Sequence, residues 1–324
     1  MKLLLVGAGQ LGSRHLQSCM KFPKPLDIYV VDNSIESLEL SKERAEEIDN
    51  TIGHRVHYRL DMKLVNENHF DFLILATGAA VRFQILSELL DMFSFTYAIL
   101  EKILFQDMSS YADASRAIAQ YDVSVFVNCP LRTYPFFKLL KKNHISKDSI
   151  TKIAYKGGEW AGLACNSIHY LDLLNFLTDE ELMEIHTDHL DDGHIESKRM
   201  GCIELTGRLD GVYSSGSIIQ IEVVKGSLAD SHIEIANGSF RVVIDELSGK
   251  FKMFDGEKLL EDSSYSIVYQ SDLTHKIMMQ LVAENTCDLI TFSESKRIHE
   301  KYISSLLLHY NKFVDVETSI LPIT

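Results

Sequence analysis

Three glycines near the N-terminus and one downstream aspartate have the residue types and spacing that a phosphate-containing ligand requires. The apolar run 2–6 leads directly into Gly7-Ala8-Gly9-Gln10-Leu11-Gly12, and Asp32 ends a second apolar run, 26–31. In a G-x-G-x-x-G turn, the first glycine permits a tight strand-to-helix turn and the second lets backbone N–H groups approach a pyrophosphate; the third lets the helix pack against the strand. This pattern predicts a dinucleotide site that includes Gln10 and Leu11.

The position of Asp32 predicts which dinucleotide binds. Asp32 follows Gly12 by twenty residues, and a carboxylate there can accept hydrogen bonds from both ribose hydroxyls of the adenosine. A 2′-phosphate at the same place would meet a like charge, so we predict NAD in preference to NADP. The neighbouring Asn33, which we include in the cofactor site, and Ser34 leave NADP open. A helix cap at Asp32 is a second interpretation, compatible with the first.

Composition excludes several classes of protein. The chain has 324 residues, of which 46% are hydrophobic and 24% charged, as expected for a globular protein of two domains. Its net charge of −14 argues against nonspecific binding to nucleic acid or to an anionic membrane. The five cysteines are scattered without C-x-x-C spacing. We expect no leader and no membrane-spanning segment. We therefore expect a cytoplasmic protein without nucleic-acid or membrane partners.

Up to about residue 128, strand-like runs alternate with amphipathic segments, which predicts βαβ units around a doubly wound parallel sheet. Strands are expected near 2–6, 27–32, 55–60, 71–76, 97–101 and 123–128. Helical periodicity covers 37–48, 80–92 and 109–120. This part of the chain is the predicted nucleotide-binding domain, residues 1–128.

The pattern changes after Asn128. Helices are expected near 134–143 and 166–177, while strand-like alternation with glycines runs from Met183 to Val268. This alternation predicts an open, largely antiparallel sheet in a second domain, residues 129–324, with a helical tail. Because helices would cover only one face of that sheet, we expect the other face to form a homodimer or homotetramer.

Two segments outside the glycine loop could carry chemistry. The first is the strand end Glu101-Lys102, because the carboxyl ends of parallel strands face the ligand crevice. Lys102 could hydrogen-bond a substrate hydroxyl, and both residues would border the cofactor together with Thr77, which follows the fourth strand. A solvated charge pair at the strand end and a plain turn at Thr77 are the alternatives.

The second segment is the glycine-rich stretch 157–162, which leads into a helix with His169 and Asp172. Three residues apart, these two side chains share a helix face, so the carboxylate could orient the imidazole as a general base. Trp160, the chain's single tryptophan, precedes this helix. A polar helix residue without a catalytic role is the alternative for His169. The cluster 186–194, with three histidines and two adjacent aspartates, is interpreted as a solvated loop, and we predict no metal site.

Together, the loop GAGQLG, the strand end Glu101-Lys102, the segment Asn128-Cys129-Pro130-Leu131-Arg132 and the approach to His169-x-x-Asp172 resemble one family over essentially the whole chain. It is the glucose-fructose oxidoreductase / inositol dehydrogenase / rhizopine catabolism family. The resemblance implies an N-terminal Rossmann domain and a C-terminal domain on an open antiparallel sheet. It also implies an NAD(P)-dependent dehydrogenase or reductase that acts on CH–OH groups of sugars, cyclitols or their derivatives.

In that family, a lysine in an E-K-P motif and the Asp and His of a D-x-G-x-H-x-x-D motif line the substrate site. Lys102, His169 and Asp172 match these motifs and are the predicted catalytic residues. This chain has Ile103 in place of the proline, and Cys165 and Ser167 in place of the first Asp and the Gly. Predicted substrate contacts also include Arg132, Trp160 and Asn166.

The resemblance implies a mechanism in which His169 removes the hydroxyl proton while Lys102 hydrogen-bonds the oxygen and Asp172 supports the imidazole. The departures from the motif favour an alternative, a catalytically impaired sensor or interaction protein that keeps the dinucleotide fold. Retention of Lys102 and His169 favours the enzyme. A methyltransferase with a similar glycine loop is disfavoured, because it leaves the second domain unexplained.

Overall fold

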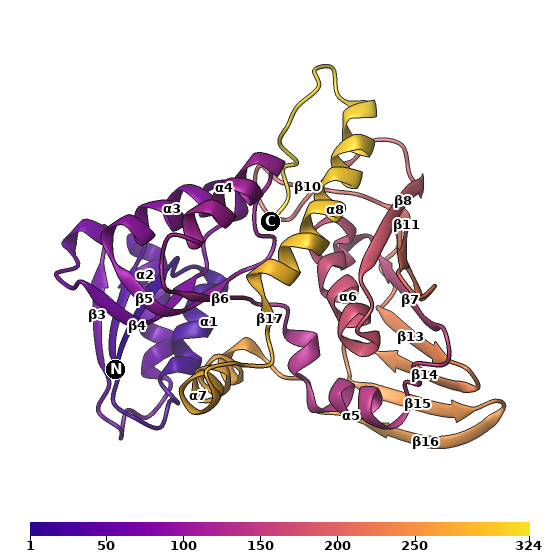
Figure 1. Ribbon diagram of the computed structural model, residues 1–324, viewed down its shortest axis with the longest axis horizontal. Helices are drawn as coiled ribbons and strands as arrows, with labels where there is room; N and C mark the ends of the chain where they lie inside the picture. The colour runs from indigo at the N-terminus through magenta and orange to yellow at the C-terminus, as the bar shows by residue number, and fades with distance from the viewer. The chain divides into compact units, whose positions relative to one another are not determined.

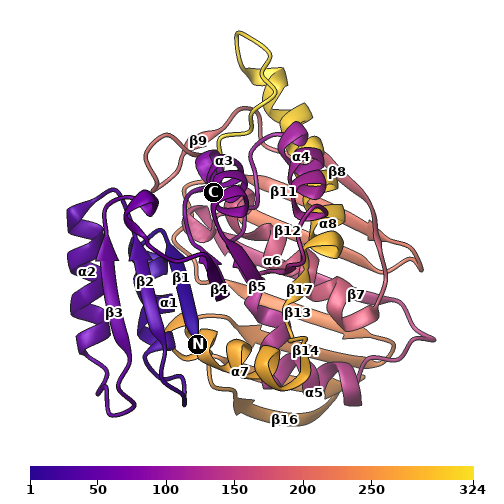
Figure 2. The same cartoon turned by 60° about the vertical axis from the view of Figure 1, so that its left-hand side comes forward.

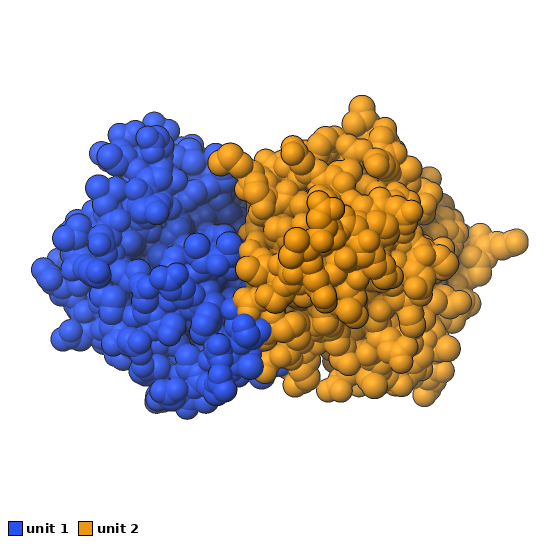
Figure 3. Space-filling model, turned by 90° about the horizontal axis from the view of Figure 1, so that it is seen from above, with its two compact units in different colours: residues 1–105, 109–128, 268–293 blue, residues 106–108, 129–267, 294–324 orange.

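The computed structural model describes residues 1–324, which form two compact units (Figure 3). Unit 1 contains residues 1–105, 109–128 and 268–293, and unit 2 contains residues 106–108, 129–267 and 294–324.

Unit 1 is built on a seven-stranded sheet with the strand order β17-β6-β5-β4-β1-β2-β3. Figure 2 shows β3, β2 and β1 side by side at one edge of it. Six strands are parallel, and the short β17 pairs antiparallel with β6. The strands are β1 (Lys2–Val6), β2 (Asp27–Val31), β3 (Arg55–Arg59), β4 (His69–Leu75), β5 (Ser94–Leu100), β6 (Ser124–Val127) and β17 (Ile290–Thr291). The predicted parallel, doubly wound sheet is confirmed.

Helices cover both faces of this sheet, with α3 and α4 on one side and α1 and α7 on the other (Figure 1). The helices are α1 (Gln10–Cys19), α2 (Ile35–Glu46), α3 (Ala79–Met92), α4 (Met108–Ile118) and α7 (Thr274–Glu284). Alternate strand residues such as Leu3, Leu5 and Ile74 pack with Leu16 of α1 in one buried cluster. Both faces are therefore apolar, as a parallel sheet with two helical layers requires.

Residues 268–293 belong to unit 1, although the sequence analysis placed them in the second domain. Helix α7 packs against α1 through Ile277 and Met278, which are part of the unit 1 core. The Cys19 thiol lies 3.7 Å from the Met278 sulfur, and Ser18 hydrogen-bonds His275. Helix α7 contacts α1 across more than 250 residues of sequence. Periodicity in the sequence predicts the helix itself, but it carries no information about which unit the helix packs against.

Unit 2 contains an eight-stranded sheet with the order β16-β15-β14-β13-β7-β12-β11-β8. Only the β7–β12 pair is parallel, so the predicted largely antiparallel sheet is confirmed. Its strands are β7 (Thr151–Gly158), β8 (Leu182–Leu190), β11 (Gly207–Tyr213), β12 (Ile218–Val224), β13 (His232–Asn237), β14 (Phe240–Asp245), β15 (Lys250–Asp255) and β16 (Lys258–Ser264). The short strands β9 (Ile195–Glu196) and β10 (Ile203–Glu204) form a separate hairpin.

Helix α6 (Leu163–Thr178) lies against the inner face of this sheet, where the Tyr213 hydroxyl donates to the Leu171 carbonyl at 2.7 Å. The remaining helices of the unit are α5 (Pro135–Asn143), the long α8 (Phe292–Tyr310) and the short turns η2 (Pro130–Thr133) and η3 (Glu159–Ala161). Eleven residues of α6 are buried, which fixes the orientation of the helix that carries His169 and Asp172.

The outer face of the unit 2 sheet is charged. Lys156 pairs with Glu222 across strands at 3.1 Å, and Arg241 pairs with Glu234 at 3.4 Å. A face of this kind can remain in water, as one side of an antiparallel sheet commonly does. A homodimer or homotetramer through this sheet stays a proposal. No helix of the chain combines the length and apolarity needed to cross a membrane.

Candidate functional site

The glycine turn after β1 has the geometry that its sequence predicts. Gly7 adopts a φ of +92°, and a Cβ there would lie 2.7 Å from the Ala76 carbonyl carbon. A Cβ on Gly12 would lie 1.8 Å from the Gly7 carbonyl oxygen. Both positions therefore exclude any side chain, and together they bring the start of α1 against the end of β1.

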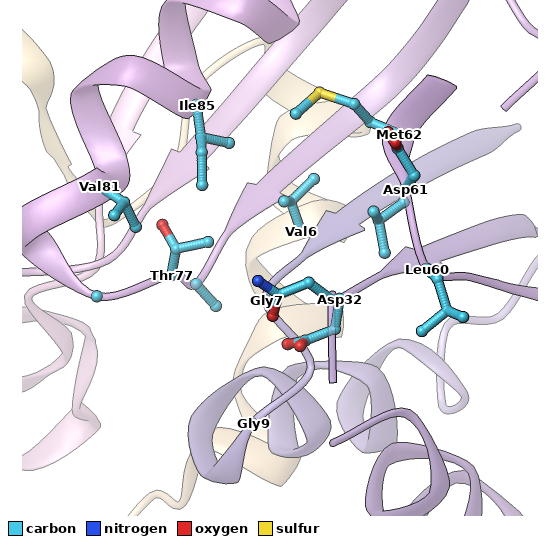
Figure 4. Close-up of a pocket in the computed structure, with 14 residues that line it drawn as sticks. Val6, Gly7, Gly9, Asp32, Leu60, Asp61, Met62, Thr77, Val81 and Ile85 are labelled. Carbon is cyan, nitrogen blue, oxygen red and sulfur yellow. The ribbon is translucent and has the colours of Figure 1, made fainter. Parts of the chain in front are cut away.

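Gly9 differs from Gly7 and Gly12, because a Cβ on it would meet nothing within 4 Å. Gly9 borders a cavity of about 520 Å³ at the carboxyl ends of the parallel strands (Figure 4). Three of the predicted cofactor residues, Asp32, Asn33 and Thr77, also line it. Its apolar wall is formed by Leu60, Met62, Val81 and Ile85. The cavity therefore combines a backbone cradle at a helix N-terminus with apolar side chains for a flat ring.

We expect Gly9→Ala and Gly12→Ala to fail in different ways. The Gly9 variant should keep its melting temperature and lose nucleotide affinity, because its methyl group projects into open space beside the phosphate cradle. The Gly12 variant should melt at a lower temperature, because its methyl group overlaps the Gly7 carbonyl. Melting curves and NADH fluorescence titrations check both. Unchanged NADH affinity in folded Gly9→Ala would contradict the phosphate-cradle assignment.

Asp32 is held by the glycine turn itself. Its Oδ2 accepts a hydrogen bond from the Ala8 N–H at 2.7 Å, and its Oδ1 accepts one from the Ser34 N–H at 2.9 Å. Ser34, not Asp32, is the N-cap of α2, where its Oγ accepts from the Ser37 N–H at 3.1 Å. The helix-cap interpretation of Asp32 is therefore wrong. Asp61 lines the same cavity, so two carboxylates border it.

The other two predicted loop residues have different surroundings. The Gln10 side-chain oxygen accepts from Arg44 of α2 at 2.6 Å, and the same guanidinium donates to the Gln10 carbonyl at 2.8 Å. Leu11 is partly buried at the start of α1. Neither borders the cavity, and their cofactor contacts stay a prediction.

A buried polar network that the sequence analysis missed surrounds Glu101. The Glu101 carboxylate is 3% exposed and hydrogen-bonds His15 Nε2 of α1 at 2.8 Å. Asn128, at the end of β6, also donates to Glu101, and the other ring nitrogen of His15 bonds Thr274 of α7 at 2.9 Å. Burial by itself raises the pKa of Glu101, but the His15 and Asn128 hydrogen bonds and the Arg82 charge outweigh it and lower that pKa. The network ties α1, which follows the glycine turn, to the strand end that precedes Lys102.

Lys102 follows Glu101 and is partly exposed, as a residue that contacts substrate requires. The segment beyond it is held by Arg82 of α3, which is 1% exposed. The Arg82 guanidinium donates to the carbonyls of Ile103, Leu104 and Thr77. The Lys102–Ile103 peptide bond is cis. Arg82 gave no sequence signal, because an arginine on an amphipathic helix is normally solvated.

In unit 2, His169 and Asp172 lie on α6 as predicted, but no hydrogen bond joins them. Asp172 is 1% exposed, and its Oδ2 accepts from Arg132 Nε at 2.9 Å while its Oδ1 has no partner. Arg132 also donates to the Asn175 side-chain oxygen at 3.1 Å. Burial raises the pKa of Asp172 to about 6 despite the opposing charge of Arg132. The carboxylate expected to orient His169 is therefore the partner of Arg132, and a substrate contact by Arg132 stays a prediction.

The remaining predicted substrate residues surround the start of α6. Trp160 is 47% exposed. The Asn166 amide donates to the Ala161 carbonyl at 2.9 Å, which closes the turn before the helix. Cys165 and Ser167, at the positions that differ from the family motif, are buried, and Ser167 donates to the Leu163 carbonyl.

The loop interpretation of 186–194 is wrong for the first part of the segment, because His186 and His189 lie on β8. No group of three or more His, Cys, Asp or Glu residues is arranged to hold a metal ion.

Comparison with known proteins gives likeness in structure only. No protein-family model matches the chain, and no curated protein sequence matches it. An oxidoreductase from Agrobacterium radiobacter, solved with NAD+, L-tartaric acid and magnesium, superimposes with a TM-score of 0.70 at 13% identity, over 96% of this chain and 97% of that one. A myo-inositol dehydrogenase from Lactobacillus casei, solved with NAD(H) and myo-inositol, gives 0.67 at 12% identity, over 94% and 93%.

A UDP-N-acetylglucosamine 3-dehydrogenase from Acidithiobacillus ferrooxidans gives a TM-score of 0.66 at 13% identity, over 94% of this chain and 96% of that one. At such identities these likenesses show that both units share the fold of these proteins. What the three proteins bind and catalyse does not transfer with the fold.

Proposed function

We propose that the protein is an oxidoreductase that transfers a hydride between NAD and a hydroxyl or keto carbon of a sugar, cyclitol or sugar derivative. The observation that carries this proposal is the unit 1 cavity, where Gly9 leaves room for a pyrophosphate and Asp32 is fixed at the end of β2. Solved structures of the same fold include an oxidoreductase with NAD+ and a dehydrogenase with NAD(H), which supports the cofactor class.

The residues fit a dinucleotide. Backbone N–H groups of the glycine turn at the start of α1 would hold the pyrophosphate, and Asp32 would accept from the ribose hydroxyls. The apolar side chains of Leu60 and Val81 would flank the adenine. When bound, the nicotinamide ring accepts or supplies the hydride.

In this proposal, Lys102 and His169 take part in the reaction. The Lys102 ammonium donates a hydrogen bond to the substrate oxygen and so stabilises its negative charge. His169 takes the proton that the hydroxyl releases in oxidation, and returns it in reduction. Asp172 is not hydrogen-bonded to His169; one of its carboxylate oxygens accepts from Arg132 instead.

The test is a screen of sugars, cyclitols, sugar acids and nucleotide sugars with NAD and NADP, followed at the NADH absorbance band. We expect turnover with one substrate class, and tighter binding of NADH than of NADPH, because Asp32 and Asp61 would repel a 2′-phosphate. NADPH binding much more tightly would contradict the NAD assignment. Intact cofactor binding without turnover would favour the sensor alternative, which rests on Ile103, Cys165 and Ser167.

A further inference from the structure

A second, smaller cavity lies wholly within unit 2, where the β9–β10 hairpin meets the start of α6. Its volume is about 120 Å³. We name it the Trp160 pocket, and its lining residues are Trp160, Gly162, Cys165, Asn166, Ser197, Lys198, Arg199 and Glu204. Since one water occupies about 30 Å³ of liquid, the pocket has room for a group the size of a phosphate or carboxylate, but not for a whole sugar.

Buried contacts hold the hairpin against the helix. Glu204 of β10 is 5% exposed, and its carboxylate accepts from the backbone N–H groups of Ala164 at 2.7 Å and Cys165 at 3.4 Å. The Glu204 carboxylate thereby binds at the first turn of α6, and the positive end of the helix dipole offsets its charge. The hairpin end is closed by a hydrogen bond from the Cys202 N–H to the Arg199 carbonyl at 3.0 Å.

Gly162 keeps the pocket open. Its φ is +80°, and a Cβ there would lie 2.8 Å from the Asn166 amide nitrogen and 3.1 Å from a Glu204 carboxylate oxygen. A side chain at this position would therefore push apart two residues that line the pocket.

The rim of the pocket is positively charged. Lys198 Nζ lies 5.1 Å from the centroid of the Trp160 ring, a cation–π arrangement. Arg199 is the next residue, and both side chains are exposed. Neither forms an ion pair, although acidic residues outnumber basic ones 46 to 32 in this chain. Two unpaired cations beside an exposed indole face suit a ligand with an anionic group next to a ring.

We propose that the Trp160 pocket binds the anionic group of the substrate, a phosphate or a carboxylate carried on a sugar. The Arg199 guanidinium and the Lys198 ammonium pair with the anion, and the indole packs against the adjoining sugar ring. This inference rests on the proposed function and narrows its substrate class to anionic sugars. A neutral sugar would leave both cations without a partner.

Trp160 is the only tryptophan, so its fluorescence reports on this pocket alone. The experiment titrates the full chain, without cofactor, with glucose 6-phosphate, UDP-glucose, glucuronate, glucose and inorganic phosphate. We expect a saturable change in emission with a charged sugar and none with glucose. The first two ligands test the phosphate source and glucuronate tests the carboxylate source. The proposal would be overturned if inorganic phosphate bound as tightly as the charged sugars. It would also be overturned if no charged sugar gave a saturable change in Trp160 emission.

Three variants complete the test. Lys198→Gln and Arg199→Gln should each weaken binding of the charged sugar at least about tenfold, as expected for loss of one charge-assisted contact. Lys258→Gln is the matched control, because Lys258 is an exposed, unpaired cation on β16 of the same unit. Binding that survives both pocket variants would contradict the proposal. If the protein turns over neutral sugars only, the Trp160 pocket inference is rejected and the oxidoreductase proposal stands. If charged sugars bind in the pocket without hydride transfer, the oxidoreductase proposal is rejected and the pocket stands as a binding site.

Discussion

Replacing His169 by Asn is expected to lower turnover by about 10²–10⁴-fold while leaving the NADH dissociation constant unchanged. An amide of similar size can hydrogen-bond the substrate but cannot take its proton, so the loss falls on the chemical step. The cofactor cavity is lined entirely by residues of unit 1, between Val6 and Ile85. A change on α6 of unit 2 should therefore leave nucleotide affinity intact. Steady-state kinetics with the substrate from the screen and a fluorescence titration of NADH measure the two effects.

Lys102→Ala is the companion variant in unit 1, and we expect it to lower turnover as well. Thr178→Ala is a control on the same helix as His169, since the Thr178 hydroxyl donates to the Leu174 carbonyl at 2.8 Å and lines neither proposed binding site. A His169→Asn enzyme that turns over at the wild-type rate would remove His169 from the mechanism. Equal losses in His169→Asn and Thr178→Ala would indicate a general disturbance of α6.

Replacing Arg132 by Met should destabilise unit 2 by about 3–5 kcal/mol at neutral pH, the usual cost of leaving one member of a buried ion pair without its partner. The Arg132 side chain is 11% exposed and that of Asp172 is 1% exposed, with 2.9 Å between Nε and Oδ2. The midpoint of urea unfolding, followed by Trp160 emission, reports on unit 2 because the only tryptophan lies there.

The loss of stability in the Arg132→Met variant should be larger at high pH than at low pH. Burial already raises the pKa of Asp172 above its ordinary value of 3.8 to about 6, and removal of the guanidinium raises it further. The folded state then holds a proton that the unfolded state releases, so stability falls as pH rises from about 4 through the folded pKa. The variant should be closer to wild type at pH 5 than at pH 8.

A double variant provides the control for this prediction. Arg132→Met with Asp172→Leu removes both charges, and we expect it to recover much of the stability that the single variant loses. Arg132→Met with no loss at pH 8 would show that the pair is solvated and contributes nothing. A double variant as unstable as the single one would assign the loss to packing of Arg132 against Phe176, whose ring centroid lies 5.5 Å from its guanidinium carbon.

The features determined by the sequence are those with a local signal. The glycine turn could be predicted because Gly7 and Gly12 stand where any Cβ would meet backbone atoms, so their spacing encodes the turn directly. Most strands and helices could be predicted because burial imposes a period of two or 3.6 residues on contiguous segments. Strand β7 (Thr151–Gly158) was not predicted. The position of Asp32 followed from the same argument, since it ends a buried strand beside that turn.

Only the tertiary structure decided which distant residues become partners. Periodicity on α6 put His169 and Asp172 on one helix face, but Asp172 pairs with Arg132, forty residues away. Likewise, His15 meets Glu101 across 86 residues and Thr274 across 259. A buried charge takes the partner that the packed core brings within hydrogen-bond distance, and spacing along the chain carries no record of that choice.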